Sequence, residues 1–154
     1  MSGQGDFDFL IGDWRVRHRQ PEARLAGCET WREFGGTCAL RSLPGGFGNI
    51  DENFLDKPGD AYHAVTIRMF DPASGTWAIW WHDARQPHAL EAPVVGAFEG
   101  GVGTFYADDV IDGRPLRVRF LWTAGAAPRW EQAFSPDAGQ TWETNWIMDF
   151  ARAT

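Results

Sequence analysis

Apolar and polar residues alternate with a period of two along most of this chain, and turn residues interrupt the alternation at near-regular intervals. In residues 142–150, for example, the even positions hold Trp, Thr, Trp, Met and Phe, and the odd positions hold Glu, Asn, Ile and Asp. This alternation is typical of β-strands that turn one face toward a core. The pattern predicts nine or ten short strands and no helix longer than two turns.

The segments between these strands are short and rich in turn residues. Residues 71–76, Asp-Pro-Ala-Ser-Gly-Thr, and residues 135–139, Ser-Pro-Asp-Ala-Gly, place proline early and glycine late, and residues 99–101 are Glu-Gly-Gly. Connections of hairpin length exclude a parallel sheet with helical crossovers. We therefore predict a single all-β domain over residues 1–154. An antiparallel up-and-down barrel is the simplest arrangement of these strands, because a closed barrel leaves no long edge strand. Nine or ten strands also leave room for a central cavity.

Composition and charge narrow the classes of partner. Nine Trp and eleven Phe supply material for an aromatic interior, and the net charge is −7. An acidic chain of this kind is a poor partner for nucleic-acid phosphates or anionic membrane surfaces, which select basic patches. No secretory leader and no long apolar run occur in the sequence, so a soluble, cytoplasmic protein is expected. Cys28 and Cys38 have no zinc-like spacing. A bridge between them is sterically conceivable across a hairpin, but two reduced core thiols are expected.

Candidate functional residues are the polar side chains embedded in apolar strand faces, since a buried polar group needs a protein or ligand partner. On this criterion the polar candidates are His18, Glu33, Glu52, His63, Asp83, Tyr106, Gln132 and Thr144. An aromatic-walled cavity with a few convergent polar groups is the usual form of a small-molecule pocket. The predicted ligand-binding residues are His18, Trp31, Glu33, Glu52, Trp81, Asp83, Tyr106, Trp122, Trp130, Gln132 and Trp146.

Each of these residues also has a structural interpretation. Any single Trp of an all-β domain is more often plain core than a binding wall, and His18 could simply hydrogen bond to a neighbouring Glu. Buried carboxylates are rare unless paired, and an Arg from the opposite wall would satisfy Glu33 or Glu52. If the two carboxylates lie close together inside, one of them would have a raised pKa. Glu33, Glu52 and His18 are therefore the candidates for proton transfer.

Metal and cofactor motifs are absent from the sequence. The four histidines lack the spacings of metal ligands, and the glycine-rich residues 45–48 precede no helix, so they are interpreted as a barrel corner. No cofactor is expected. Trp80 is predicted to face outward, either as a homodimer contact or as a lone surface apolar residue.

Four stretches carry a family resemblance: residues 6–18 (DFDFLIGDWRVRH), 45–52 (GGFGNIDE), 70–77 (FDPASGTW) and 130–146 (WEQAFSPDAGQTWETNW). They resemble a bacterial family of uncharacterised calycin-like (lipocalin-like) domains. The resemblance implies that the apolar turn of residues 7–11 plugs one barrel end, and that Trp14 and Arg152 pack together at that end. Haem-binding calycins of the nitrobindin kind use a histidine late in the chain. No histidine follows His88, so a haem role is not expected.

Three functions fit these features. The first is binding of a small, partly apolar molecule in the barrel. The second is an isomerase, hydratase or cyclase that uses interior Glu or His for proton transfer, and the third is a packed barrel that acts as a protein-interaction module. The fold permits all three. An open cavity would exclude the third, and two interior carboxylates near a common point would favour the second over the first.

Overall fold

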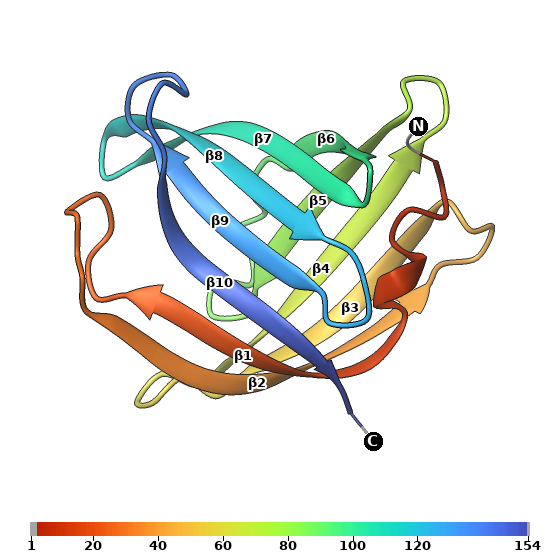
Figure 1. Ribbon diagram of the computed structural model, residues 1–154, viewed down its shortest axis with the longest axis horizontal. Helices are drawn as coiled ribbons and strands as arrows, with labels where there is room; N and C mark the ends of the chain where they lie inside the picture. The colour runs from red at the N-terminus through yellow and green to blue at the C-terminus, as the bar shows by residue number, and fades with distance from the viewer. Residues whose placement is uncertain (1–2, 154) are drawn as a thin grey trace.

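The computed structural model describes residues 3–153 and forms a closed barrel of ten antiparallel strands (Figure 1). Each strand pairs with its neighbours in sequence, and β1 pairs with β10 to close the ring. The elements are η1 (Asp8–Leu10), β1 (Gly12–Pro21), β2 (Trp31–Ser42), β3 (Gly48–Leu55), β4 (Tyr62–Asp71), β5 (Thr76–Asp83), β6 (Val94–Glu99), β7 (Val102–Ile111), β8 (Arg114–Thr123), β9 (Arg129–Ser135) and β10 (Glu143–Arg152). The predicted all-β up-and-down barrel is confirmed.

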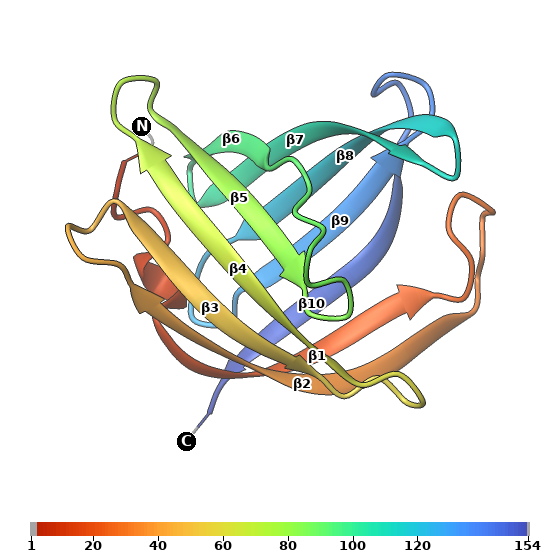
Figure 2. The same ribbon diagram turned by 180° about the vertical axis from the view of Figure 1, so that it is seen from behind.

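The two ends of the barrel differ. The 3₁₀ turn η1 lies at the end that carries the β2–β3, β4–β5, β6–β7 and β8–β9 connections (Figure 1). We call this the closed end. The β1–β2, β3–β4, β5–β6, β7–β8 and β9–β10 connections surround the opposite, open end, and Figure 2 shows the same arrangement from behind.

The turn before β1 plugs the closed end, as predicted. Phe7 and Leu10 are buried, and the Trp14 indole N–H donates to the Leu10 carbonyl oxygen at 2.8 Å. Arg152 lies over the Trp14 ring, 3.9 Å from its centroid, and donates to the Ile11 carbonyl oxygen at 2.6 Å. The first and last strands are therefore joined at this end. Ile11 was expected in the plug but is 38% exposed, because the chain has already left the turn there.

Two adjacent glycines usually indicate a turn, and from the sequence Gly35–Gly36 is predicted to be one. This prediction is wrong, because the pair lies inside one long strand. The alternation in residues 28–34 and 37–43 suggests two separate strands, but β2 runs through both glycines and pairs with β1 from Trp31 to Leu40. A Cβ on Gly36 would collide with the Phe54 carbonyl oxygen and lie 3.1 Å from His18 Nε2. Glycine here permits a close approach between strands rather than a reversal of the chain.

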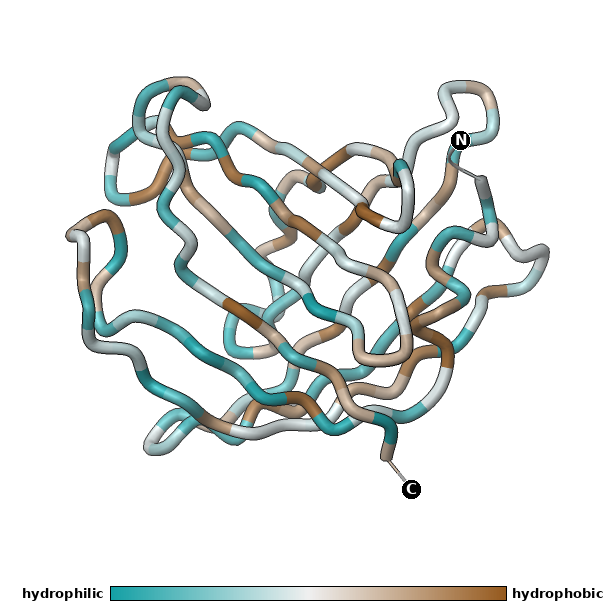
Figure 3. Tube along the Cα trace, viewed as in Figure 1, coloured by the Kyte–Doolittle hydropathy of each residue, from teal (hydrophilic) through white to brown (hydrophobic). Residues whose placement is uncertain are grey.

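In the β3–β4 hairpin, the face that points into the barrel is the one that the sequence suggested would point outward. Figure 3 shows hydrophilic and hydrophobic segments alternating along the strands. The apolar residues of each strand were expected to face inward. In β3 the inward residues are Asn49, Asp51 and Asn53, whereas Glu52 faces out. In β4 Arg68 is buried and Ile67 is 38% exposed. The inward polar residues are tolerated because they satisfy one another with hydrogen bonds and an ion pair.

The two cysteines are free, and only one of them belongs to the core. Cys38 is buried, and burial raises the pKa of its thiol. Cys28 lies half-buried in the β1–β2 loop, where its thiol donates to the Thr30 carbonyl oxygen at 3.4 Å. The expectation of two core thiols is therefore wrong for Cys28. Within residues 3–153, no helix is long and apolar enough to cross a membrane.

Candidate functional site

A cavity of about 530 Å³ opens at the open end of the barrel. We call it the mouth cavity. Inward-facing aromatic and aliphatic side chains of β4 to β10 form its walls, and polar side chains gather at its rim. The aromatic residues that line it are Tyr62, Trp81, Phe120, Trp130, Phe134 and Trp146.

The tryptophans of the mouth cavity pack edge to face in one continuous array. The Trp146 ring lies 5.5 Å from that of Trp81 and 5.2 Å from that of Trp130, measured between centroids. Phe120 extends the array from Trp130 at 4.9 Å. Such perpendicular contacts favour defined ring orientations, so the walls are ordered before any ligand arrives.

His18 lies behind this array rather than on the cavity surface. The Trp146 indole N–H donates to His18 Nδ1 at 3.1 Å, and the imidazole stacks on Phe34 at 4.7 Å. Burial lowers the pKa of His18 to about 4, so the ring is neutral at pH 7. His18 positions Trp146 and does not line the mouth cavity.

A charged cluster occupies the rim of the mouth cavity where β5 ends. Arg85 stacks on the Tyr62 ring, 3.5 Å from its centroid, and pairs with Asp83 at 2.7 Å and with Asp60. Burial alone would raise the pKa of Asp83, but the hydrogen bonds from Arg85 outweigh it and leave that pKa below its usual range. Burial also raises the pKa of Tyr62 to about 12. Asp83 is therefore a paired carboxylate and not a free base.

Arg24 lines the same rim from the β1–β2 loop. Its guanidinium lies 5.3 Å from the centroid of the Phe134 ring, and burial lowers its pKa. No carboxylate in residues 3–153 forms an ion pair with it. Arg24 is thus a cation at the cavity entrance that is held by an aromatic face.

Gln132 is the polar side chain of the mouth cavity wall on β9. Its side-chain N–H donates to the Asn145 side-chain oxygen at 2.8 Å. The Asn145 amide nitrogen is buried and has no hydrogen-bond partner in the described part of the chain. This amide pair places polar atoms on an otherwise apolar wall.

A second, much smaller hollow of about 20 Å³ lies deeper in the barrel. We call it the deep hollow. It shares four wall residues with the mouth cavity, namely Ile79, Trp81, Phe120 and Trp130. Its other walls include Trp122 and the inward polar residues of β3 and β4. The two hollows therefore adjoin, with the deep hollow toward the closed end.

The polar wall of the deep hollow is a buried ion pair with its own hydrogen bonds. Arg68 and Asp51 are 2.8 Å apart, and both side chains are almost completely buried. Arg68 Nη1 donates to the Asn49 side-chain oxygen at 3.0 Å, and the Asp51 carboxylate accepts from Asn53 and from the backbone N–H of Thr66. The positive and negative charges of this interior polar cluster balance.

Four of the residues predicted to bind a ligand lie on the outer wall. Glu33 pairs with Arg17 at 2.6 Å and Glu52 lies 3.9 Å from Arg41, all with exposed side chains. Trp31 shares the outward face of Glu33 and is 36% exposed. The remaining one, Tyr106, faces outward beneath Arg117 and Trp142. His63, another polar candidate, is also exposed. The prediction that these five side chains point inward is wrong.

The structure brings together six of the other seven predicted ligand-binding residues, and His18 is the exception. Trp81, Asp83, Trp130, Gln132 and Trp146 line the mouth cavity, and Trp122 lines the deep hollow. All six lie on β5, β8, β9 and β10, where aromatic residues mark the inward face of each strand. Their roles in binding stay predictions.

Sequence reasoning missed the interior polar cluster and the cation at the mouth. Asn49, Asp51 and Asn53 repeat with a period of two in the middle of a strand, and this all-polar repeat was the available signal. Arg68 was missed as well, because an arginine in a strand is usually assigned to the outward face. No local pattern marks Arg24, because it enters the mouth from an irregular loop. In residues 3–153, no group of three or more His, Cys, Asp or Glu is placed to hold a metal ion.

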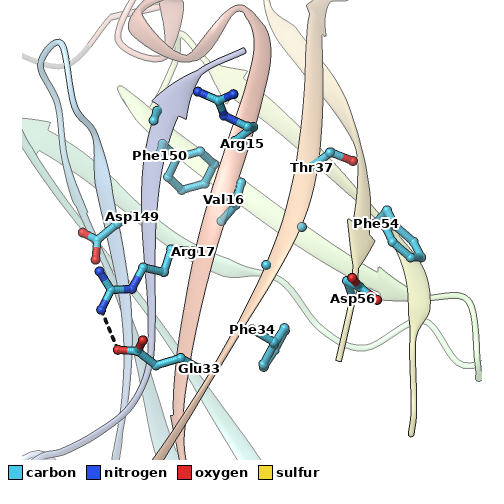
Figure 4. Close-up of a pocket in the computed structure, with 13 residues that line it drawn as sticks. Arg15, Val16, Arg17, Glu33, Phe34, Thr37, Phe54, Asp56, Asp149 and Phe150 are labelled. Atoms are coloured by element: carbon cyan, nitrogen blue, oxygen red, sulfur yellow. Dashed lines mark hydrogen bonds and ion pairs between the residues drawn. The ribbon is translucent and has the colours of Figure 1, made fainter. Parts of the chain in front are cut away.

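A further hollow of about 740 Å³ lies on the outer wall over Gly35 and Gly36 (Figure 4). Glycine has no side chain to fill this part of the β2 surface. Of the rim residues, Arg17 pairs with Glu33, and Asp149 pairs with Arg129 at 2.7 Å. Because this hollow lies outside the barrel and none of the tryptophans lines it, the interior hollows are the better candidate for a ligand site.

The barrel is calycin-like, and comparison with solved structures supports this fold. The S-type phycobiliprotein lyase CPES from Guillardia theta is similar to it with a TM-score of 0.60, and the match covers 100% of this chain and 94% of that chain. The two sequences are 11% identical, so the likeness concerns the fold alone. No family model matches the chain, and no curated protein does.

Proposed function

We propose that this protein binds a small, partly apolar molecule in the mouth cavity. The observation that carries the proposal is an ordered aromatic wall beside an open space of about 530 Å³, with charged side chains gathered at its rim. The similar solved barrel belongs to a phycobiliprotein lyase, which makes a bilin one reasonable candidate ligand. The apolar walls would bury most of the ligand, and rim charges such as Arg24 would contact its outer end.

The alternative functions have less support from the geometry. Proton transfer needs a carboxyl or imidazole group with access to the ligand, but Glu33 and Glu52 face outward and His18 lies behind Trp146. Asp51 and Asp83 are paired with arginines. The other carboxylates that line the mouth cavity, Glu91, Asp108, Asp109 and Asp112, lie at its rim, and three of them are exposed to solvent. A fully packed interaction module would have no cavity of this volume.

The test combines native mass spectrometry of protein purified from its own host with titration calorimetry. The calorimetric panel contains 2-acetylnaphthalene, oleate and a bilin. We expect a co-purifying small molecule or saturable one-to-one binding of at least one member. Absence of both would overturn the proposal.

Two neighbouring tryptophans of β5 provide a matched pair of variants. Trp81 lines the mouth cavity, whereas the side chain of Trp80 points to the outer wall. Trp81→Ala should weaken binding by about tenfold or more, because it removes a large apolar contact. Trp80→Ala should leave the Kd unchanged. Equal losses in the two variants would place binding outside the cavity.

Three further expectations stay predictions beside the binding role: a cytoplasmic location, the absence of a cofactor, and a homodimer contact at Trp80. Light scattering of the wild type and of Trp80→Ala measures the third. A lower mass for the variant alone would support the contact, and a monomeric wild type would contradict it.

A further inference from the structure

Two side chains that line the deep hollow each carry a hydrogen-bond donor without a partner in the described part of the chain. Arg68 Nε and Trp122 Nε1 are both buried, and neither has a hydrogen-bond partner among residues 3–153. Each residue is 3% exposed, and each lines the deep hollow. The guanidinium of Arg68 lies over the Trp122 ring, 5.5 Å from its centroid. Two unmatched donors thus belong to neighbouring side chains in one small space.

Buried donors in native proteins are nearly always matched by an acceptor. Arg68 Nη1 contacts both Asp51 and Asn49, and the Nε–H of the same guanidinium is left for another partner. The indole of Trp122 can only donate. The group that completes this site must therefore supply acceptor lone pairs.

The charge of the site favours a neutral acceptor. The positive charge of Arg68 is already balanced by Asp51 at 2.8 Å. A second anion in the deep hollow would be repelled by the Asp51 carboxylate, which also lines it. It would also lose its hydration against the aromatic walls, which costs free energy. A carbonyl oxygen has two lone pairs and no charge, and so it can accept from both donors without that repulsion.

The size of the deep hollow agrees with a single oxygen-sized group. Its volume of about 20 Å³ is little more than one water molecule needs. The walls that it shares with the mouth cavity mean that a ligand in the larger space can extend a slender end into the smaller one.

We propose that the deep hollow is a subsite for a neutral carbonyl oxygen, which accepts hydrogen bonds from Arg68 Nε and Trp122 Nε1. The apolar body of the same ligand lies against the tryptophans of the mouth cavity. The ligand class is thus an aromatic or aliphatic ketone, aldehyde, ester or amide with the carbonyl at its narrow end. This inference rests on the proposed binding function and adds the chemistry of the inner end.

The test uses three probes with one naphthalene body: 2-acetylnaphthalene carries a neutral carbonyl, 2-isopropylnaphthalene has a similar shape without oxygen, and 2-naphthoate is an anion. Calorimetry gives the Kd of each for the wild type, Trp122→Phe and Trp146→Phe. Trp122→Phe removes one donor of the deep hollow and keeps an aromatic ring. Trp146→Phe is the control, since Trp146 lines only the mouth cavity and its N–H is engaged by His18.

We expect Trp122→Phe to weaken the ketone about tenfold relative to the hydrocarbon. Trp146→Phe should shift both probes alike and leave their ratio unchanged. The wild type should bind 2-naphthoate at least tenfold more weakly than the ketone. An unchanged ratio in Trp122→Phe, or tighter binding of the anion, would overturn the subsite while leaving the binding function in place. If none of the probes binds, the subsite is overturned as well, because the proposal requires the naphthalene ring to be held in the mouth cavity.

An infrared measurement on the wild type tests the same contact without a variant. The carbonyl stretch of ¹³C-labelled 2-acetylnaphthalene should move to lower frequency on binding, relative to its position in hexane. A hydrogen bond weakens the carbon–oxygen double bond, and two donors weaken it further. A band at the hexane position would contradict the proposal, even if the ketone binds tightly.

Discussion

His18 shows how one buried side chain ties the pH of the solution to the stability of the barrel. The native imidazole is neutral, stacked on Phe34 and bonded to Trp146, and its pKa is lowered to about 4 by burial. In the unfolded chain the same group has the ordinary value of 6.5. Between these two values the unfolded state binds a proton that the native state does not.

The free energy of unfolding should therefore fall as the pH is lowered from about 7 to about 4. The contribution of His18 to this fall is about 3 kcal/mol over the full window. His18→Gln cannot take up a proton, so its loss of stability over the same window should be smaller. Urea denaturation at pH 7.5, 6 and 5 measures the difference. Parallel curves for the two proteins would show that His18 is protonated in the native state as well.

The Arg68–Asp51 pair should matter more for stability than the ion pairs on the outer wall. Asp51→Asn leaves the buried guanidinium without its counter-charge and should lower the free energy of unfolding by about 3–5 kcal/mol. Glu33→Gln removes an exposed partner of Arg17 and should leave that free energy unchanged within error. Chemical denaturation of both variants tests this contrast. A loss of similar size in both would mean that the interior polar cluster is no more stabilising than a surface pair.

At the scale of the strand, the adjacent glycines of β2 have different roles. Neither has a positive φ, so backbone strain does not distinguish them. A Cβ at position 36 collides with the Phe54 carbonyl oxygen, whereas a Cβ at position 35 meets nothing within 4 Å.

Gly36→Ala should therefore lower the free energy of unfolding by about 1–3 kcal/mol, because a backbone oxygen cannot move aside cheaply. Gly35→Ala should be neutral or slightly stabilising, since alanine restricts the unfolded chain more than glycine does. Thermal unfolding of the two single variants is the measurement. If Gly35→Ala were the more damaging variant, the explanation by close approach would be wrong.

The strands show which parts of the site could be predicted from the sequence. On β5 and β9 the alternation is strong and has large aromatic residues on one face, so Trp81, Asp83, Trp130 and Gln132 were assigned correctly to the interior. On β3 both faces carry mixed residues, and the rule that apolar residues point inward selected the wrong one. Only the partners across the sheet, Thr66 and Arg68 on β4, make the polar face the inner one. That information lies in the pairing and not in either strand alone.

At the scale of the whole molecule, the ten strand pairs are unequal in length. β1 and β2 pair over ten residues, whereas β5 and β6 pair over three, Trp77 to Ile79 against Val94 to Gly96. The loop that joins β5 and β6 also contributes Glu91 and Ala92 to the mouth cavity. This short ladder is where the closed ring has the fewest hydrogen bonds to break.

Amide hydrogen exchange should accordingly be fastest, among the strand pairs, in peptides that cover the β5–β6 ladder, and slowest in those that cover β1 and β2. Mass spectrometry of peptic fragments measures both in one experiment. Saturation with 2-acetylnaphthalene should slow exchange in the β5–β6 ladder, since its inner residues Ile79 and Val94 line the mouth cavity. Uniform protection of all strand pairs would show that the β5–β6 ladder is not the least stable pair of the barrel.

The aromatic plug sets a fixed limit to the depth of the barrel. Phe7 packs edge to face against Trp77, Phe98 and Trp122, and the Arg68 guanidinium lies over the Phe7 ring. Rotation of one side chain cannot lengthen the interior, because each ring is held by several others. Ligands of one chemical type but of different length would therefore share the same inner anchor and differ in how far they protrude. Discrimination by length would then be exerted at the open-end loops, which are free to change in sequence without disturbing the packed end.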